Sequence, residues 1–224
     1  MGQTLPIDLV NTITYFAVFT EILPVFFYLI FKEKIHNKGI RVILLALIIG
    51  FSIDIAGLYL IAKGNDNFQL YNTFIPIELL LLLFFFNIIV KSTFIRNFSF
   101  ISFALFIIFW GYMFITRGSH KFLDSAVNIS YVIILICSLS FYFHLIKKPE
   151  VPIYTNQHFW IVSAYMLYIA GTFFLFLFMY SLKPAEQAEY YVLNFVFLII
   201  KTILLSIAMF MKPASQQRKK FELT

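Results

Sequence analysis

The sequence predicts an all-α fold in which seven helices cross a membrane as a single bundle. Of the 224 residues, 61% are hydrophobic and only 12% are charged, and the mean hydropathy is +0.88. Soluble domains carry roughly 25% charged residues, so this composition does not suit a surface that faces water on all sides. Seven apolar segments follow one another along the chain, separated by short polar loops.

The seven segments have the length of membrane spans, because about 20 apolar residues at about 1.5 Å per residue cross roughly 30 Å of hydrocarbon. The predicted spans are residues 9–31, 42–61, 70–90, 98–116, 126–146, 159–181 and 190–210. The loops leave no room for a soluble domain, so residues 1–224 are predicted to form a single transmembrane domain. The basic segment 212–224 is expected to be a solvated tail next to the membrane.

The distribution of Lys and Arg predicts the orientation, because loops on the cytoplasmic side carry an excess of these residues. With the N-terminus outside, the cytoplasmic side holds twelve: Lys32, Lys34, Lys38, Arg41, Lys91, Arg96, Lys147, Lys148, Lys212, Arg218, Lys219 and Lys220. The outer side holds four: Lys63, Arg117, Lys121 and Lys183. The N-terminus is therefore predicted to lie outside and the C-terminus in the cytoplasm, with the chain in the inner (cytoplasmic) membrane.

The net charge of +6 resides mainly in these short loops, so it indicates orientation and no nucleic-acid partner is expected. The expected partners are the lipid bilayer and an unknown small ligand or membrane protein. Cys137 is the only cysteine, and no disulfide can form within the chain. Residues 1–11 lack a positively charged region and a small-residue cleavage site, so the first helix is expected to be retained.

Two spans contain a short sequence echo that suggests an internal repeat. The second span contains DIAGLYL from Asp54, and the sixth contains YIAGTFFL from Tyr168. With the fourth span as a linker, spans one to three and five to seven would form parallel repeats, as occur in transporters. Superposing the two triplets is then expected to place Gly57 near Gly171 and Glu78 near Lys201.

Four charged residues lie within the predicted spans: Glu21, Asp54, Glu78 and Lys201. A charge near the bilayer centre costs about 2.5–3.5 kcal/mol on insertion scales, and such residues usually face the interior of a bundle. At about 1.5 Å per residue, the four lie roughly 11–18 Å below the predicted outer ends of their helices. They are therefore predicted to meet in one polar site that binds a ligand or an ion.

Tyr71 and Asn194 complete the candidate site. Tyr71 precedes Glu78 by seven residues and Asn194 precedes Lys201 by the same spacing. Seven residues are about two helical turns, so each pair projects from one face of its helix.

Two prolines are expected to disturb the helices that carry the acids. Pro76 removes a backbone donor and frees the carbonyl group of Asn72, and Pro24 does the same for Thr20. Such carbonyl groups are tolerated in a membrane where they line a cavity or meet a polar partner.

Glu78 is predicted to face Lys201, directly or through one water. Their depths differ by about 4–5 Å by helix rise, and an unpaired ion is costly in hydrocarbon. Because one cation serves three acids, at least one acid is expected to be neutral at pH 7. A structural interpretation stays open, in which Glu78 and Lys201 form an ion pair for stability and the other acids are protonated or hydrogen-bonded.

The sequence predicts that the chain is not an enzyme and that it binds neither a cofactor nor a metal. The four histidines lie at or outside the predicted membrane boundaries, without the spacing of a metal site: His36, His120, His144 and His158. Trp110, Trp160 and the tyrosines in general are expected to be packing or interface anchors. The sequence contains no nucleophile elbow, phosphate loop, paired-cysteine motif or H-E-x-x-H signature.

Two segments resemble an uncharacterised family of small bacterial seven-helix membrane proteins. They are Leu70–Phe86 (LYNTFIPIELLLLLFFF) and Phe159–Phe178 (FWIVSAYMLYIAGTFFLFLF). The resemblance implies a sensory or signalling-associated role and assigns no activity to a residue.

The chain also resembles two other classes of seven-helix membrane protein, retinal proteins and a class of transporters. A lysine on the seventh span is similar to that of retinal proteins, but Phe197 stands where microbial rhodopsins carry an aspartate four residues earlier. The topology also resembles that of the three-plus-one-plus-three SWEET and PQ-loop transporters, although the chain contains no Pro-Gln dipeptide. This second likeness is one of fold alone.

The expected function is that of a non-enzymatic sensor or signalling component with a buried polar site in the middle of the membrane. The alternative is a transporter for a small solute, with proton coupling as one form. Two further alternatives are a retinal-binding photoreceptor and a membrane enzyme that acts on lipid.

Overall fold

The computed structural model describes residues 7–31, 37–118, 121–147, 152–178 and 184–211. Within these ranges, the side chains of residues 7–8 and 184–191 are not described. The described residues form helices, with no strand among them: α1 (Ile7–Thr20), α2 (Leu23–Phe31), α3 (Lys38–Ala62), α4 (Phe68–Ile89), α5 (Thr93–Arg117), α6 (Asp124–Lys147), the 3₁₀ helix η2 (Ile153–Thr155), α7 (Gln157–Phe178) and α8 (Pro184–Phe210). Within the described residues, seven helical spans are long and apolar enough to cross a membrane. The prediction of an all-helical fold with seven such spans is confirmed.

The first span differs from the prediction, because α1 and α2 are separated at Glu21 and Ile22. Other spans differ only at their ends. For example, α3 begins at Lys38, four residues before the predicted position 42. Asn37 explains this earlier start, because its side-chain oxygen accepts a hydrogen bond from the backbone N–H of Gly39 at 2.9 Å and caps the helix.

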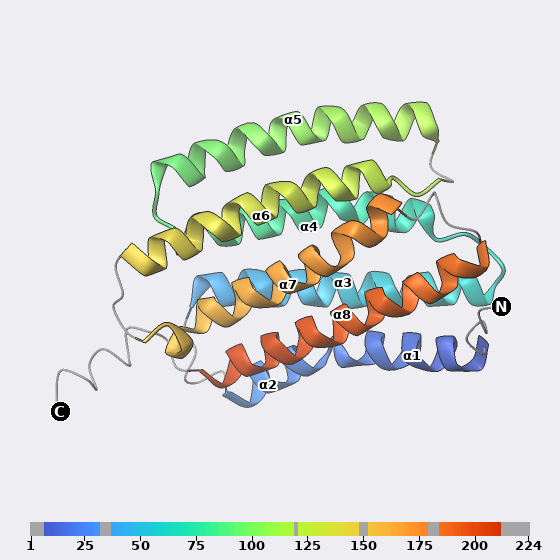
Figure 1. Cartoon of the computed structure of the whole chain (residues 1–224), viewed down its shortest axis with the longest axis horizontal. Coiled ribbons are helices and arrows are strands. Elements are labelled where there is room, and N and C mark those ends of the chain that lie inside the picture. The colour runs from blue at the N-terminus through green and yellow to red at the C-terminus, as the bar shows by residue number, and fades with distance from the viewer. Residues whose placement is uncertain (1–6, 32–36, 119–120, 148–151, 179–183, 212–224) are drawn as a thin grey trace.

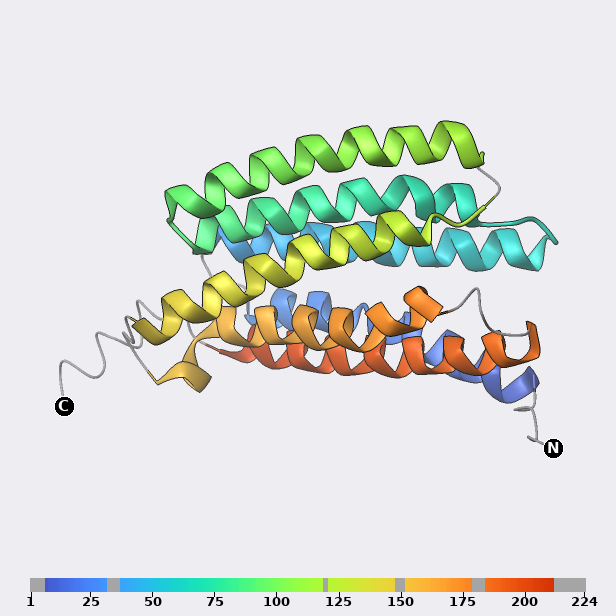
Figure 2. The same ribbon diagram turned by 45° about the horizontal axis from the view of Figure 1, so that its top comes forward.

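Successive spans run in opposite directions, and α5 lies at the edge of the bundle against α4 and α6 (Figures 1 and 2). The other spans pack side by side in the order α1 with α2, α8, α7, α6, α4 and α3. A smaller contact between α3 and the first span closes this ring. The ring, with α5 outside it, creates the interior in which the charged residues meet.

The exterior of the bundle is apolar, as a lipid-facing surface requires. Ile115 is 83% exposed and Phe100 78% exposed, both on the peripheral helix α5. Inside, large side chains such as Phe85, Phe86 and Leu82 are almost fully buried. The apolar side chains thus serve two environments, the lipid outside and the packed core within.

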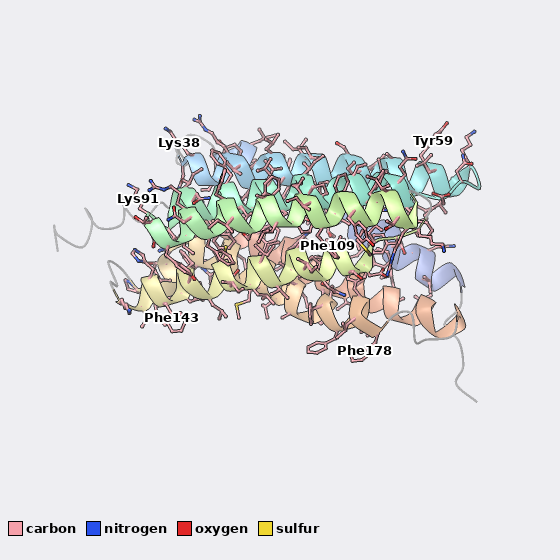
Figure 3. The ribbon with its side chains drawn as sticks, turned by 90° about the horizontal axis from the view of Figure 1, so that it is seen from above. Lys38, Tyr59, Lys91, Phe109, Phe143 and Phe178 are labelled. Atoms are coloured by element: carbon pink, nitrogen blue, oxygen red, sulfur yellow. The ribbon has the colours of Figure 1, made fainter. Side chains whose placement is uncertain are left out.

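The two ends of the bundle are named here by residues in Figure 3: the Lys38 end, with Lys38 and Lys91, and the Tyr59 end. Because α3 and α4 are antiparallel, α3 starts and α4 finishes at the Lys38 end. The predicted tail 212–224 and the loop positions His36 and Ser119 lie outside the described residues. The orientation across a membrane stays a prediction.

A glycine allows α7 and α8 to approach closely. A Cβ atom added to Gly171 would overlap the ring of Phe197, whereas one added to Gly111 on α5 would meet nothing within 4 Å. Gly171→Ala is therefore expected to destabilise the fold by about 1–3 kcal/mol through overpacking. Unfolding in detergent, followed by circular dichroism, measures this loss.

Gly111→Ala is the matched control, because it makes the same change in a membrane-spanning helix with free space around it. It is expected to be neutral or to stabilise by up to about 1 kcal/mol, since Ala has the better helix propensity. Combining Gly171→Ala with Phe197→Leu should recover stability. Equal losses in the two single variants would contradict the close contact.

Candidate functional site

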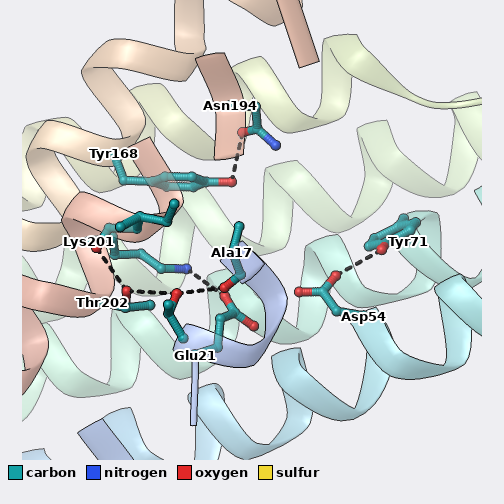
Figure 4. A network of polar contacts seen from close by, with 10 residues as sticks. Ala17, Glu21, Asp54, Tyr71, Tyr168, Asn194, Lys201 and Thr202 are labelled. Carbon is teal, nitrogen blue, oxygen red and sulfur yellow. Dashed lines mark hydrogen bonds and ion pairs between the residues drawn. The ribbon is translucent and has the colours of Figure 1, made fainter. Parts of the chain in front are cut away.

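Several helices enclose a cavity of about 720 Å³ between α1, α3, α4, α6, α7 and α8. All six side chains predicted for the site border this cavity: Glu21, Asp54, Tyr71, Glu78, Asn194 and Lys201. Figure 4 shows five of them, converging from the first span, α3, α4 and α8. The volume falls within the roughly 300–1,000 Å³ that small-molecule sites occupy.

The centre of the site is a buried ion pair between Glu21 and Lys201. The Nζ atom of Lys201 donates to Oε1 of Glu21 at 3.3 Å. The two side chains are only 5% and 8% exposed. The second carboxylate oxygen of Glu21, Oε2, is buried and accepts no hydrogen bond from an N–H or O–H group of the described residues. An ion pair at this depth is tolerable because each charge offsets the other.

The interruption of the first span places Glu21 at this point. Pro24 lacks a backbone N–H and cannot donate to the carbonyl of Thr20, so the regular ladder stops. Instead, the N–H of Glu21 donates to Val18 at 3.1 Å and that of Ile22 to Phe19 at 3.4 Å, both bonds to the third preceding residue. The tighter turn moves Glu21 out of the helical register and toward α8.

Two hydroxyl groups lie next to the ion pair and join the same helices. Thr202 donates to the hydroxyl oxygen of Thr20 at 3.2 Å, and Thr20 donates to the carbonyl of Ala17 at 2.6 Å. Both threonines are buried. These bonds link α1 to α8 beside the charges (Figure 4).

Tyrosine rings from α7 surround the ammonium group of Lys201. Its Nζ atom lies 4.6 Å from the ring centre of Tyr168 and 5.8 Å from that of Tyr165. The hydroxyl of Tyr168 in turn donates to Oδ1 of Asn194 at 3.3 Å. The face of an aromatic ring attracts a cation, so the tyrosines contribute to holding the buried charge.

Asp54 and Tyr71 form a second polar contact across α3 and α4. The Tyr71 hydroxyl donates to Oδ1 of Asp54 at 2.8 Å. Gly57 makes room for this ring, since a Cβ atom at that position would lie 2.9 Å from the Tyr71 hydroxyl oxygen. The Asp54 carboxyl group points toward Glu21 in Figure 4 and interacts electrostatically with Glu21 and Lys201.

Glu78 was predicted to face Lys201 directly or through one water, and the direct form is wrong, because Lys201 pairs with Glu21. The water-mediated form stays a prediction. Glu78 borders the same cavity and interacts with Lys201 only at longer range. The reason is the order of the helices: α8 packs against α1 and α2, whereas α4 packs against α3, α5 and α6. Similar depth in the membrane did not determine which helices are neighbours.

The cavity extends from the ion pair to the Tyr59 end of the bundle. There its wall includes Asn11 and Tyr15 of α1 and Ile61 of α3, which are exposed. Among the described residues, the cavity is therefore open at this end.

Toward the Lys38 end, packed apolar side chains close the interior. Phe85 and Ile43 are at most 1% exposed, and the ring centres of Phe27 and Phe210 lie 4.6 Å apart. One half of the bundle thus contains a charged cavity and the other a dense core.

Sequence reasoning missed the aromatic part of the wall. Tyr131, Tyr165 and Tyr168 border the cavity, whereas the sequence predicts only packing or interface positions for these tyrosines. Their spacing held a signal: Tyr165, Tyr168 and Thr172 recur at intervals of three and four residues, on one face of α7.

The described histidines do not border the cavity. His158 lies in α7 at the Lys38 end, where its Nε2 and the Nδ2 of Asn37 are 2.9 Å apart. His36 and His120 lie outside the described residues. Among the residues that are described, no three His, Cys, Asp or Glu side chains are placed to hold a metal ion.

No protein-family model matches the chain, and no curated protein or solved structure matches it either.

Proposed function

We propose that this chain is a non-enzymatic membrane receptor, a sensor or signalling component, that binds a small polar solute in the cavity. The observation that carries the proposal is the position of the Glu21–Lys201 pair in a cavity that reaches one end of the bundle. The opposite half is a packed core. A solute could thus reach the charges from one side and be recognised there without crossing.

The ion pair offers a way to transmit binding. It joins the interruption between α1 and α2 to α8, and the Thr20–Thr202 bond lies beside it. A solute that competes for Glu21 or Lys201 would weaken the contact between the first and last spans. A signalling response requires that the ligand bind two arrangements of the helices with different affinity.

A transporter for a small solute is the second candidate, favoured by the interruption at Glu21. Transporters bind substrates and ions at interrupted helices near the middle of the membrane. Two close contacts also agree with the predicted repeat: Tyr71 lies over Gly57 between α3 and α4, and Phe197 lies over Gly171 between α7 and α8. In a transporter the packed half would have to open in a second state.

We also propose that the chain lies in the inner membrane of the cell, with its Tyr59 end facing outward and its Lys38 end facing the cytoplasm. The basis for this orientation is the distribution of Lys and Arg. Tags inserted at Asn67 and Ser119 are expected to be reachable from outside intact cells. Tags at His36 or the C-terminus should be reachable only after permeabilisation. A cytoplasmic signal from Ser119 would reverse the assignment, and the cavity would then open inward.

Cysteine labelling tests whether the cavity admits solutes. Ser130 and Ser138 are both buried on α6, but only Ser130 borders the cavity. In a Cys137→Ala background, Ser130→Cys is expected to react with neutral 2-hydroxyethyl methanethiosulfonate at least about tenfold faster than Ser138→Cys. Mass spectrometry of the purified protein measures both rates. Equal rates would mean that the cavity is not connected to solvent, and the receptor proposal would fail.

Sidedness separates the receptor from the transporter. A membrane-impermeant cationic reagent is expected to modify Ser130→Cys only from the Tyr59 end if the chain is a receptor. Modification from either side, in vesicles of opposite orientation, would indicate alternating access and favour transport.

A further inference from the structure

We propose that the cavity recognises a small organic cation with an ammonium group. This inference rests on the proposed function and names the chemical class of its ligand. It draws on three features of the cavity: its charge, its unused hydrogen-bond acceptors and its aromatic wall.

The charge of the cavity favours a cation. Three acids border it, Glu21, Asp54 and Glu78, against one base, Lys201. Glu21 already offsets the charge of Lys201 at 3.3 Å. Ionisation of either remaining acid leaves the cavity with a net negative charge. A low-dielectric cleft with one sign of charge raises the local concentration of counter-ions by about tenfold or more.

The acids also hold acceptors that a ligand could use. Among the described residues, Oε2 of the buried Glu21 side chain accepts no hydrogen bond from an N–H or O–H group. The Asp54 carboxyl group accepts a bond from Tyr71 and faces the Glu21 carboxyl group. A buried polar atom without a partner is costly, and an ammonium group, with several N–H donors, would satisfy it.

The wall supplies the aromatic surface that binds ammonium groups. Tyr71, Tyr131, Tyr165 and Tyr168 all border the cavity. Lys201 already places its own ammonium group over the Tyr168 ring at 4.6 Å. The protein thus shows within its own structure that this wall accepts an alkylammonium group. Aromatic rings combined with carboxylates are the usual means of recognising such cations.

An anionic ligand fits these features less well. It would have to compete with Glu21 for Lys201 while facing Asp54 and Glu78 at the same cavity. A neutral ligand would leave the charge of the acids unused. The competing ligand classes therefore differ in charge, and charge is what the experiment varies.

The experiment measures the reaction of Ser130→Cys, in the Cys137→Ala background, with three methanethiosulfonates of similar size. One is the cationic 2-(trimethylammonium)ethyl reagent, one the anionic 2-sulfonatoethyl reagent and one the neutral 2-hydroxyethyl reagent. Each rate is divided by the rate of the same reagent with a small free thiol. The corrected cation rate is expected to exceed the anion rate by about tenfold or more.

Charge-removing variants test the source of this preference. Glu78→Gln is expected to lower the corrected cation-to-anion ratio several-fold, since the carboxyl group borders the cavity. Asp66→Asn removes the same charge from an exposed loop position outside the cavity wall. It should leave the ratio nearly unchanged, because exposed charges are screened by salt.

Ethanolammonium then tests whether the cavity binds a cation or only has a negative electrostatic potential, because this ion carries the N–H donors that the unpaired acceptor requires. Ethanolammonium is expected to protect Ser130→Cys from the neutral reagent at concentrations where propan-1-ol, its uncharged analogue, does not. Equal protection by the two, protection by neither, or equal corrected rates for the cationic and anionic reagents would overturn the cation proposal and leave the receptor proposal standing. Failure of all three reagents to react would overturn both.

Discussion

Replacing Lys201 by Met is expected to destabilise the protein by about 3 kcal/mol, because it leaves the buried Glu21 carboxylate without its cation. Glu21→Gln should cause a loss of similar size by leaving Lys201 without its nearest carboxylate, at 3.3 Å. Both side chains are less than 10% exposed, so solvent does little to relieve either change. Chemical denaturation in detergent measures both losses.

The double variant shows whether the two residues act as a pair. Glu21→Gln with Lys201→Met removes both charges together, and such replacements of buried ion pairs are often nearly neutral. The double variant is therefore expected to be more stable than the sum of the single losses predicts, by about 2 kcal/mol. Additive losses would mean that the contact contributes no coupling.

Glu78 provides the matched comparison, because it is the acid that membrane depth alone assigned to Lys201. Pairing Glu78→Gln with Lys201→Met should give a coupling free energy below about 1 kcal/mol, since the two residues interact only at longer range. A larger coupling for Glu78 than for Glu21 would contradict the arrangement of the cavity.

The sequence was sufficient to predict the seven spans and to select the residues that border the cavity. Membrane spans are encoded locally, because every 20-residue segment must itself be apolar enough for lipid. The four charged side chains border one cavity because buried charges usually face the interior of a bundle. Tyr71 and Asn194 border it as well, each two turns from a charged residue on the same helix face.

The sequence was not sufficient to predict which charges touch. Pairing depends on the order of helices around the ring, and the hydropathy of α4 and α8 does not reveal their neighbours. Pro24 indicated a freed carbonyl at Thr20 but not that the break would turn Glu21 toward α8. Pro76 was interpreted correctly, since the carbonyl of Asn72 accepts a hydrogen bond from Nε1 of Trp110 at 2.9 Å.

Asn72→Leu is the second substitution with a large expected effect, a loss of about 3 kcal/mol. The Asn72 side chain is fully buried and holds the connection between α5 and α6. Its Nδ2 donates to the carbonyl of Lys121 at 2.8 Å, and its Oδ1 accepts from the N–H of Leu123 at 3.0 Å. Leucine has a similar size but satisfies neither group, and each buried group left unpaired costs about 1–3 kcal/mol.

The consequence should extend to the cavity, because Phe122, which borders it, lies between those two anchored residues. We therefore expect Asn72→Leu to change the labelling rate of Ser130→Cys as well as the unfolding free energy.

The control is Asn87→Leu on the same helix. Among the described residues, the side chain of Asn87 donates only to the carbonyl of Leu83 within α4, and its buried Oδ1 has no partner. Removing an already unsatisfied oxygen should change stability by less than about 1 kcal/mol. A loss at Asn87 as large as that at Asn72 would show that burial of any α4 amide, and not the anchoring of the α5–α6 connection, determines stability.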